Sequence, residues 1–140
     1  MSRALVQHGE HLAVVRLGPG ADLPAWSGAA TVFSVTATAT ETSIVCAQAG
    51  VPKKARQEGP FTAFEVEGPL DFTLTGVLHE LLQPLAEAQI PVFTLSTFDT
   101  DWILVPADSA ARAAESWRGS GHVVRAPHES TEQPPSEGSA

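Results

Sequence analysis

Two helical patterns, separated by extended segments, most constrain the fold of this chain. Residues 77–88 carry apolar side chains at helical spacing and predict a helix that Pro84 bends by removing one hydrogen bond. Thr75 is the expected N-cap of this helix, and Gly76 opens it. Residues 109–118 predict a second helix, with Asp108 as its N-cap and Gly119 after its last turn. The apolar stripe of the first helix consists of Val77, Leu78, Leu81, Leu82, Leu85 and Ala88.

Short extended patterns surround both helices. Residues 61–67, 92–97, 102–105 and 122–125 predict four strands, and Gly68-Pro69 ends the first. Residues 61–125 therefore follow the order strand, helix, strand, strand, helix, strand. This order is typical of the ferredoxin-like βαββαβ fold of the α+β class, an antiparallel sheet with both helices on one face.

The first half of the chain predicts a reduced version of the same unit. Residues 11–17, 32–38 and 43–47 are expected strands, residues 21–26 a single turn, and residues 50–60 an exposed linker. We therefore expect a degenerate module and linker at 1–60 and an intact module at 61–126, with a shared core and neighbouring sheets. Residues 127–140 hold no large apolar side chain and are expected to form a disordered tail.

Composition excludes several classes of function. The net charge is −8 and no run of Lys or Arg exceeds Lys53-Lys54, which argues against nucleic-acid binding. A single cysteine, Cys46, excludes an internal disulfide and a multi-cysteine zinc site. No apolar stretch reaches the roughly 18 residues of a membrane span. We expect a cytoplasmic protein without metal or cofactor.

Two stretches of the second half resemble the ACT-domain family. Residues 66–78 (VEGPLDFTLTGVL) are similar to the strand, loop and helix start of an ACT domain, and residues 90–105 (IPVFTLSTFDTDWILV) to its central hairpin. Together with residues 42–45 (TSIV), the pattern resembles tandem-ACT proteins, which include uncharacterised bacterial proteins and, more distantly, the cytosolic arginine sensors called CASTOR proteins. The resemblance implies a regulatory protein that binds an amino acid between modules and assembles as a homodimer.

A candidate site combines the start of the first helix with the hairpin turn. Unpaired N–H groups at a helix start favour an anion, and Gly76 lets a ligand approach the backbone or simply permits a tight turn. Asp101 suits an ammonium or guanidinium group, although aspartate is also ordinary in a hairpin turn. The resemblance adds Ser43 and Ile44 as a wall from the other module. The candidate ligand-binding residues are Ser43, Ile44, Thr75, Gly76, Val77, Leu78, Ser96, Thr97, Phe98, Thr100 and Asp101.

Three functions compete on these observations. The first is an amino-acid-binding protein that relays occupancy to an unidentified protein partner. The second is a ligand-free interaction or oligomerisation module in which the site is vestigial. An enzyme is disfavoured because no nucleophile–base pair is visible: Cys46 lies in an apolar strand, and Glu65 and Glu67 fit a solvated strand face better than a catalytic pair.

Overall fold

The computed structural model describes residues 2–71 and 75–126. The expected tail at 127–140 and three residues of the ACT-like stretch, 72–74, lie outside the described residues. The described residues form these elements in chain order: β1 (Ala4–Gln7), β2 (Leu12–Leu17), β3 (Ser34–Ala37), β4 (Thr42–Ala47), the 3-10 turn η1 (Gln48–Gly50), β5 (Gln57–Val66), α1 (Val77–Glu87), β6 (Phe93–Ser96), β7 (Asp101–Pro106), the 3-10 turn η2 (Ala107–Ser109), α2 (Ala110–Gly119) and β8 (Val123–Arg125).

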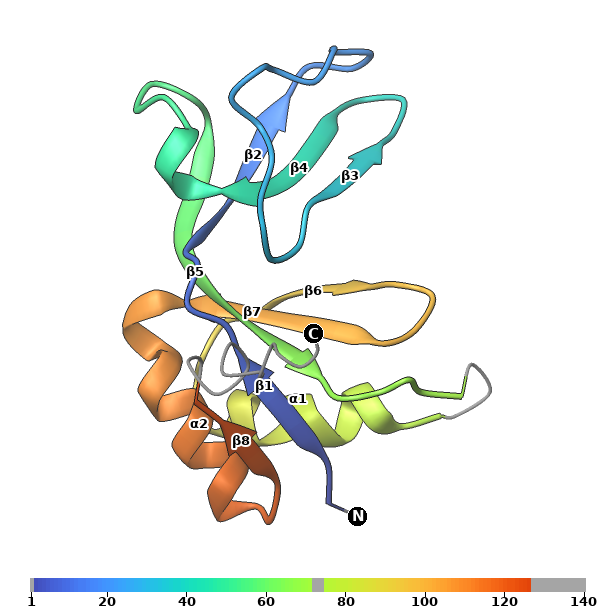
Figure 1. The fold of residues 1–140 in the computed structure, drawn as a ribbon, viewed down its shortest axis with the longest axis vertical. Helices are drawn as coiled ribbons and strands as arrows, with labels where there is room; N and C mark the ends of the chain where they lie inside the picture. The colour runs from blue at the N-terminus through green and yellow to red at the C-terminus, as the bar shows by residue number, and fades with distance from the viewer. Residues whose placement is uncertain (1, 72–74, 127–140) are drawn as a thin grey trace, which may run out of the picture.

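The lower lobe in Figure 1 consists of α1, α2 and a sheet in the order β6-β7-β5-β1-β8. Both helices cover one face of this sheet, which confirms the α+β ferredoxin-like prediction. Trp117 of α2 anchors the core, because its ring packs edge-on against Phe64 with the centroids 4.8 Å apart. Its indole Nε1 donates a hydrogen bond of 2.8 Å to the carbonyl oxygen of Leu81 in α1, which joins the two helices.

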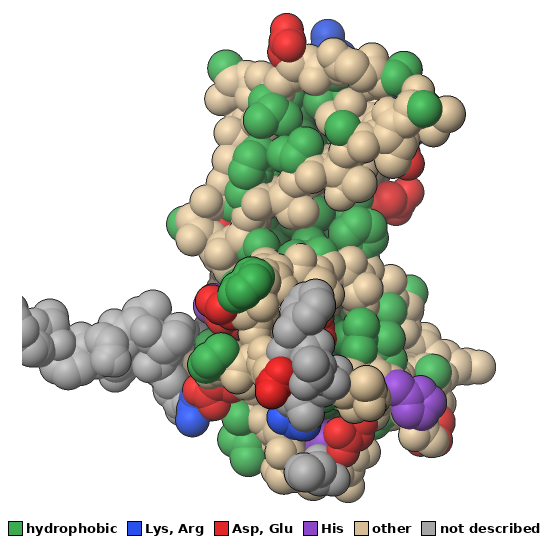
Figure 2. All heavy atoms as spheres, turned by 90° about the vertical axis from the view of Figure 1, so that its right-hand side faces the viewer, with side chains coloured by type: hydrophobic (Ala, Val, Ile, Leu, Met, Phe, Trp, Pro, Cys, Tyr) green, Lys and Arg blue, Asp and Glu red, His purple; other side chains and the backbone are tan. Residues whose placement is uncertain are grey.

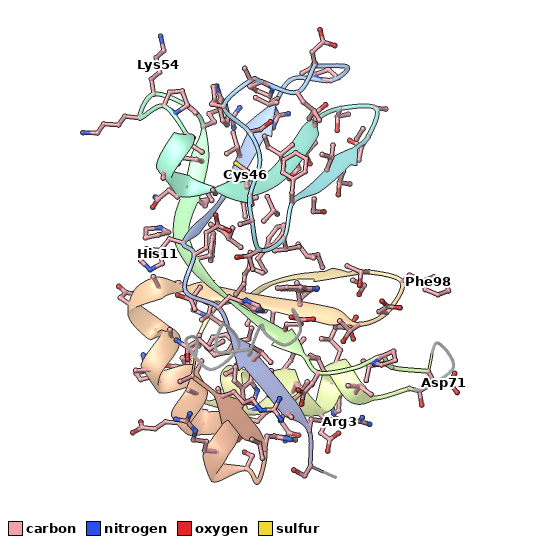
Figure 3. The ribbon with its side chains drawn as sticks, viewed as in Figure 1. Arg3, His11, Cys46, Lys54, Asp71 and Phe98 are labelled. Carbon is pink, nitrogen blue, oxygen red and sulfur yellow. The ribbon has the colours of Figure 1, made fainter. Side chains whose placement is uncertain are left out.

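The upper lobe is the antiparallel arrangement β3-β4-β2, which continues through β2 onto β5. Its apolar side chains form two clusters on opposite faces of these strands, and one cluster contains the fully buried Cys46 (Figure 3). Strand β5 is shared by both lobes: Gln57 pairs with Val15 of β2, whereas Thr62 pairs with Val105 of β7. The two sheets are therefore continuous.

The expected linker at 50–60 is wrong at its end, because residues 57–60 already belong to β5. This part of β5 shows no strand pattern in the sequence, because Gln57 and Glu58 are polar, Gly59 and Pro60 are typical of turns, and the segment is largely exposed. The expected module boundary at residue 60 consequently falls inside one continuous strand.

Strand β1 has no counterpart in the sequence expectations. It inserts between β5 and β8, where Leu5 faces Val66 in antiparallel and Val124 in parallel register. Leu5 is fully buried in the lower-lobe core. Four residues are too short for a period to be read, and the partners lie some sixty and more residues away.

Both expected helix caps are wrong. Helix α1 begins at Val77 after Gly76, which is the N-cap with a positive φ of 80°, so Thr75 does not cap it. Helix α2 begins at Ala110, because Asp108 lies in the preceding 3-10 turn. Helix α1 continues through Pro84 to Glu87. Within the described residues, no helix is both long and apolar enough to cross a membrane.

Candidate ligand-binding site

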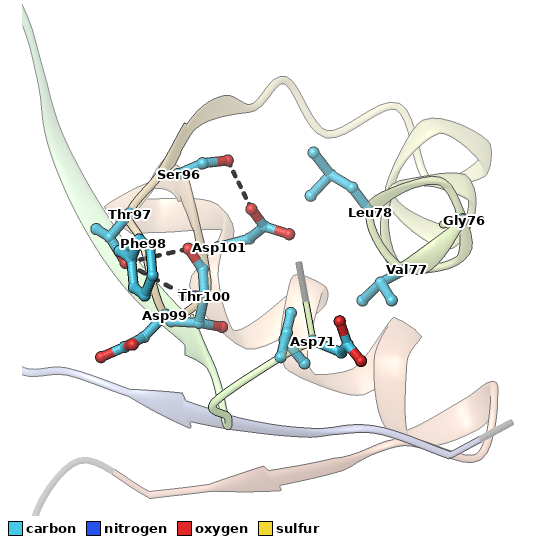
Figure 4. Close-up of a pocket in the computed structure, with 11 residues that line it drawn as sticks. Asp71, Gly76, Val77, Leu78, Ser96, Thr97, Phe98, Asp99, Thr100 and Asp101 are labelled. Atoms are coloured by element: carbon cyan, nitrogen blue, oxygen red, sulfur yellow. Dashed lines mark hydrogen bonds between the residues drawn. The ribbon is translucent and has the colours of Figure 1, made fainter. Parts of the chain in front are cut away.

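A pocket of about 230 Å³ lies between the start of α1 and the turn of the β6–β7 hairpin (Figure 4). Two segments that are about twenty residues apart in sequence form its opposite walls, as the βαββ order predicts. The loop that follows β5 supplies the floor. The lining residues are Leu70, Asp71, Gly76, Val77, Leu78, Ser96, Thr97, Phe98, Asp99, Thr100 and Asp101.

The wall from α1 offers backbone N–H groups. The first intrahelical hydrogen bond is donated by the Glu80 N–H to the carbonyl oxygen of Gly76, at 2.9 Å. The N–H groups of Val77 and Leu78 therefore have no acceptor within the helix, and they carry the positive end of its dipole. The left-handed conformation of Gly76 sets this start, so the tight-turn explanation of the glycine is sufficient.

The wall from the hairpin offers a carboxylate in a fixed position. The Ser96 hydroxyl donates a hydrogen bond of 2.6 Å to Asp101 Oδ1, and Figure 4 shows the Asp101 carboxylate directed toward α1. The carboxylate of Asp99 and the ring of Phe98 point away from α1. Phe98 is 89% exposed at the tip of the hairpin, where Figure 3 shows it projecting from the molecule.

The hairpin turn is fastened to the end of β5. The Thr100 hydroxyl, on a residue only 7% exposed, donates a hydrogen bond of 2.6 Å to the carbonyl oxygen of Val66. The Leu70 N–H donates to the carbonyl oxygen of Asp99 at 2.8 Å. Within the turn, the Thr97 N–H donates to the Thr100 carbonyl at 2.8 Å. These bonds hold the pocket wall in place without a ligand.

The structure brings together most of the candidate residues. Eight of them line the pocket, and Thr75 directly precedes it. Ser43 and Ile44 do not line it: they lie in β4 of the upper lobe, where Ile44 is fully buried and faces Val15 and Val35. The eight lining candidates are Gly76, Val77, Leu78, Ser96, Thr97, Phe98, Thr100 and Asp101.

Three lining residues were absent from the candidate set: Leu70, Asp71 and Asp99. A signal for each existed in the sequence, because all three lie inside the two stretches that resemble the ACT family. Their place at the pocket depends on the Leu70–Asp99 hydrogen bond, which folds the loop after β5 against the hairpin turn.

The two walls of the pocket favour ligand groups of opposite charge. Asp71, Asp99 and Asp101 are its charged residues, and no Lys, Arg or His is among its described lining residues. The carboxylates attract a cationic group, whereas the helix start attracts an anionic one. A zwitterion with both groups on one carbon matches this pair. Within the described ranges, no three or more His, Cys, Asp or Glu side chains are grouped so that they could hold a metal ion.

Two family models match the chain. Residues 58–116 match the model described as an ACT domain, and residues 10–54 match a model described as an N-terminal domain. No curated protein sequence matches the chain.

Solved structures share its fold. The crystal structure of a protein from Agobacterium tumefaciens is 29% identical, with a TM-score of 0.83 over 90% of this chain and 94% of that one. A protein of unknown function from Vibrio cholerae is 14% identical, with a TM-score of 0.67 over 84% and 89%. The regulatory subunit of aspartate kinase from Thermus flavus is 10% identical, with a TM-score of 0.59 over 82% and 95%. The likeness to the last two shows a shared fold alone.

The family match and the fold agree on the same segment. The stretch that matches the ACT model runs from β5 to α2 and therefore contains both walls of the pocket. ACT domains are regulatory, ligand-binding and non-catalytic units. Residues 58–116 of this chain are accordingly similar to an ACT domain in both sequence and fold.

Proposed function

We propose that this protein is a non-catalytic regulatory protein that binds a free amino acid in the pocket between α1 and the β6–β7 hairpin. One observation carries the proposal: the pocket places helix-start N–H groups, which have no acceptor within α1, opposite the oriented carboxylate of Asp101. An amino acid needs both, because its carboxylate accepts hydrogen bonds and its ammonium donates them.

The proposed pose follows from the two walls. The ligand carboxylate accepts from the N–H groups of Val77 and Leu78, where the helix dipole favours negative charge. The ligand ammonium donates to Asp101, whose other interaction with Ser96 keeps the carboxylate facing the pocket. The ligand side chain lies toward Leu70 at the floor.

In this proposal the protein is a cytoplasmic homodimer, and occupancy of the pocket is relayed to a protein partner. A bound amino acid bridges α1 and the hairpin, so it favours the conformation in which both walls are in place. The competing function is a protein-interaction module with a vestigial site. The largely exposed side chain of Phe98 beside the pocket favours this second candidate. A measurement of ligand binding distinguishes the two functions.

The first test is a thermal-shift screen of the full chain against the twenty amino acids. A ligand that binds only the folded state stabilises it by about 2.7 kcal/mol at a hundred times its dissociation constant. We expect one amino acid or a small group to raise the melting temperature. A flat panel at millimolar concentrations would contradict ligand binding and favour the interaction module.

The second test replaces the carboxylate with an amide. Asp101→Asn preserves shape and can still accept from Ser96, but it removes the charge that faces the ammonium. Loss of one hydrogen bond to a charged group corresponds to about a 10- to 100-fold weaker affinity by calorimetry. Asp99→Asn is the matched control, because its carboxylate points away from α1 and should leave affinity nearly unchanged. Equal effects of both substitutions would argue against the pose.

A further inference from the structure

The outer strands of the sheet are protected to different degrees. The edge of β8 is occupied by a side chain, because Arg118 Nη2 donates a hydrogen bond of 2.8 Å to the carbonyl oxygen of Val124. Strand β3, at the opposite end, pairs only with β4 in the part of the chain that the structure describes. An unprotected edge strand is a template for pairing with another strand.

The hairpin geometry shows which groups of β3 face outward. The Thr38 N–H donates to the Glu41 carbonyl at 2.9 Å and closes the β3–β4 turn. Hydrogen-bonded and non-hydrogen-bonded pairs alternate along an antiparallel ladder, so Thr36 directs its backbone groups toward β4. Val35 and Ala37 therefore direct their N–H and C=O groups to the free edge.

The surface around this edge is apolar and uncharged. No charged residue occurs from Leu23 to Thr40, although 17% of the whole chain is charged. Leu23, Phe33 and Val35 are 49%, 39% and 42% exposed within that segment. In Figure 2, hydrophobic and uncharged side chains accordingly cover most of the upper-lobe face. Charged side chains commonly protect edge strands from pairing, and here they are missing.

Two sets of charged side chains from outside the segment contact it. Glu10 accepts hydrogen bonds from the Ala30 and Thr31 N–H groups, before β3 begins. Arg16 and Glu41 form an ion pair at the β3–β4 turn. Arg16 Nε is 3.7 Å from Glu41 Oε1, and Arg16 Nη2 donates to the Thr40 carbonyl. Strand β3 itself carries no charged residue, in a chain of net charge −8.

We propose that β3 pairs antiparallel with β3 of a second copy of this chain across a two-fold axis. In such a pair the residue on the axis faces its own copy, and its neighbours on either side face each other across the interface, so any charge near the axis would lie close to its like. An uncharged edge pairs with an identical edge without repulsion between like charges. An edge that binds a basic or acidic partner is expected to carry residues of the opposite charge. Phe33, which directly precedes β3 and is 39% exposed, extends the apolar contact beyond the paired backbones.

This inference rests on the homodimer of the proposed function and names β3 as its interface. The interface can be tested separately from ligand binding. The pocket lies in the lower lobe and β3 in the upper lobe. Loss of the dimer should therefore leave the amino-acid response in the thermal-shift screen intact. A dimeric wild type that responds to no amino acid would contradict the proposed function and leave the pairing standing.

The experiment measures the molar mass of the full chain by sedimentation equilibrium. Ala37→Pro removes an outward N–H without touching a β3–β4 hydrogen bond, and Val35→Lys places a charge opposite its copy. The control is Val123→Lys, because Val123 is 51% exposed on the protected β8 edge. We expect a wild-type dimer, at least a hundredfold weaker dimerisation in both β3 variants, and no change in the control.

Several results would overturn the inference. A wild type that stays monomeric up to about 1 mM excludes a functional dimer through this edge. A dimer that survives both β3 substitutions uses another surface, such as β6. Equal dissociation of the Val123→Lys control shows a general effect of added charge. Urea unfolding of every variant identifies loss of folding, and a folded Ala37→Pro variant decides the test if Val35→Lys fails to fold.

Discussion

The buried hydroxyl of Thr100 offers the sharpest test of how the pocket is held together. It donates a hydrogen bond of 2.6 Å to the Val66 carbonyl and so fastens the hairpin turn to the end of β5. Thr100→Val keeps the shape of the side chain and removes the donor. The cost is the lost bond together with the desolvation of a buried carbonyl, about 1–3 kcal/mol.

This cost is large enough to measure by two methods. For a chain of this length, 1 kcal/mol corresponds to roughly 4 °C in melting temperature, so Thr100→Val should melt about 4–12 °C below the wild type. Urea unfolding should show a lower midpoint with an unchanged m-value. Amino-acid affinity should fall as well, because the turn that carries Asp101 loses its anchor.

Thr100→Ser is the matched control. It keeps the hydroxyl and loses one methyl group, which costs about 1 kcal/mol or less. The serine variant should therefore be the more stable of the two. A valine variant as stable as the wild type, or more stable than the serine variant, would refute the role assigned to this hydrogen bond.

Two further predictions concern the upper lobe. Burial raises the pKa of Glu10, but hydrogen bonds from the Thr31 and Ala30 N–H groups outweigh it and leave the pKa below its ordinary value. The Glu10 carboxylate therefore stabilises the folded state above its unfolded-state pKa, and this stabilisation is lost as pH falls through its folded-state pKa. Glu10→Gln should lower the free energy of unfolding by about 1 kcal/mol at about pH 7 and by much less at about pH 3, as measured by urea unfolding. Burial raises the pKa of the Cys46 thiol. This thiol should therefore react with a thiol reagent at least about a hundredfold more slowly in the native protein than in denaturant. Rapid labelling of the native protein would contradict the burial of Cys46.

The lower lobe could be predicted because its signals are local. The apolar stripe of α1 and the short apolar run of β7 each lie within a dozen residues, and the order of the elements allows few topologies. Strand β1 and the start of β5 could not be predicted. Strand β1 is too short, and the start of β5 too polar, to show the alternation of apolar side chains that marks a strand. Both are strands only through distant partners: Leu5 pairs with Val66, and Gln57 with Val15.

The site residues, too, could be predicted where they depend on local patterns and not where they depend on distant contacts. Helix α1 and the β6–β7 hairpin are neighbours in the βαββ order, so their residues meet whenever that unit folds. The place of Ser43 depended instead on how two lobes pack, which no local pattern encodes. The predicted N-cap of α1 is wrong for a smaller reason, since a single left-handed residue, Gly76, moves the helix start past Thr75. The predicted N-cap of α2 is wrong because a 3-10 turn that contains Asp108 precedes that helix.

Strand β5 explains why the two lobes behave as one unit in these predictions. Its first half pairs with β2 of the upper lobe, and its second half pairs with β7, which carries Asp101. The end of the same strand accepts the Thr100 hydrogen bond beside the pocket. A paired strand is stiff along its length, so displacement of the hairpin by a ligand must strain either this bond or the strand. Thr100→Val removes the first of these connections while leaving the strand pairing intact. Measurement of amide exchange in β2 with and without ligand, in the wild type and in this variant, therefore distinguishes a coupled upper lobe from an independent one.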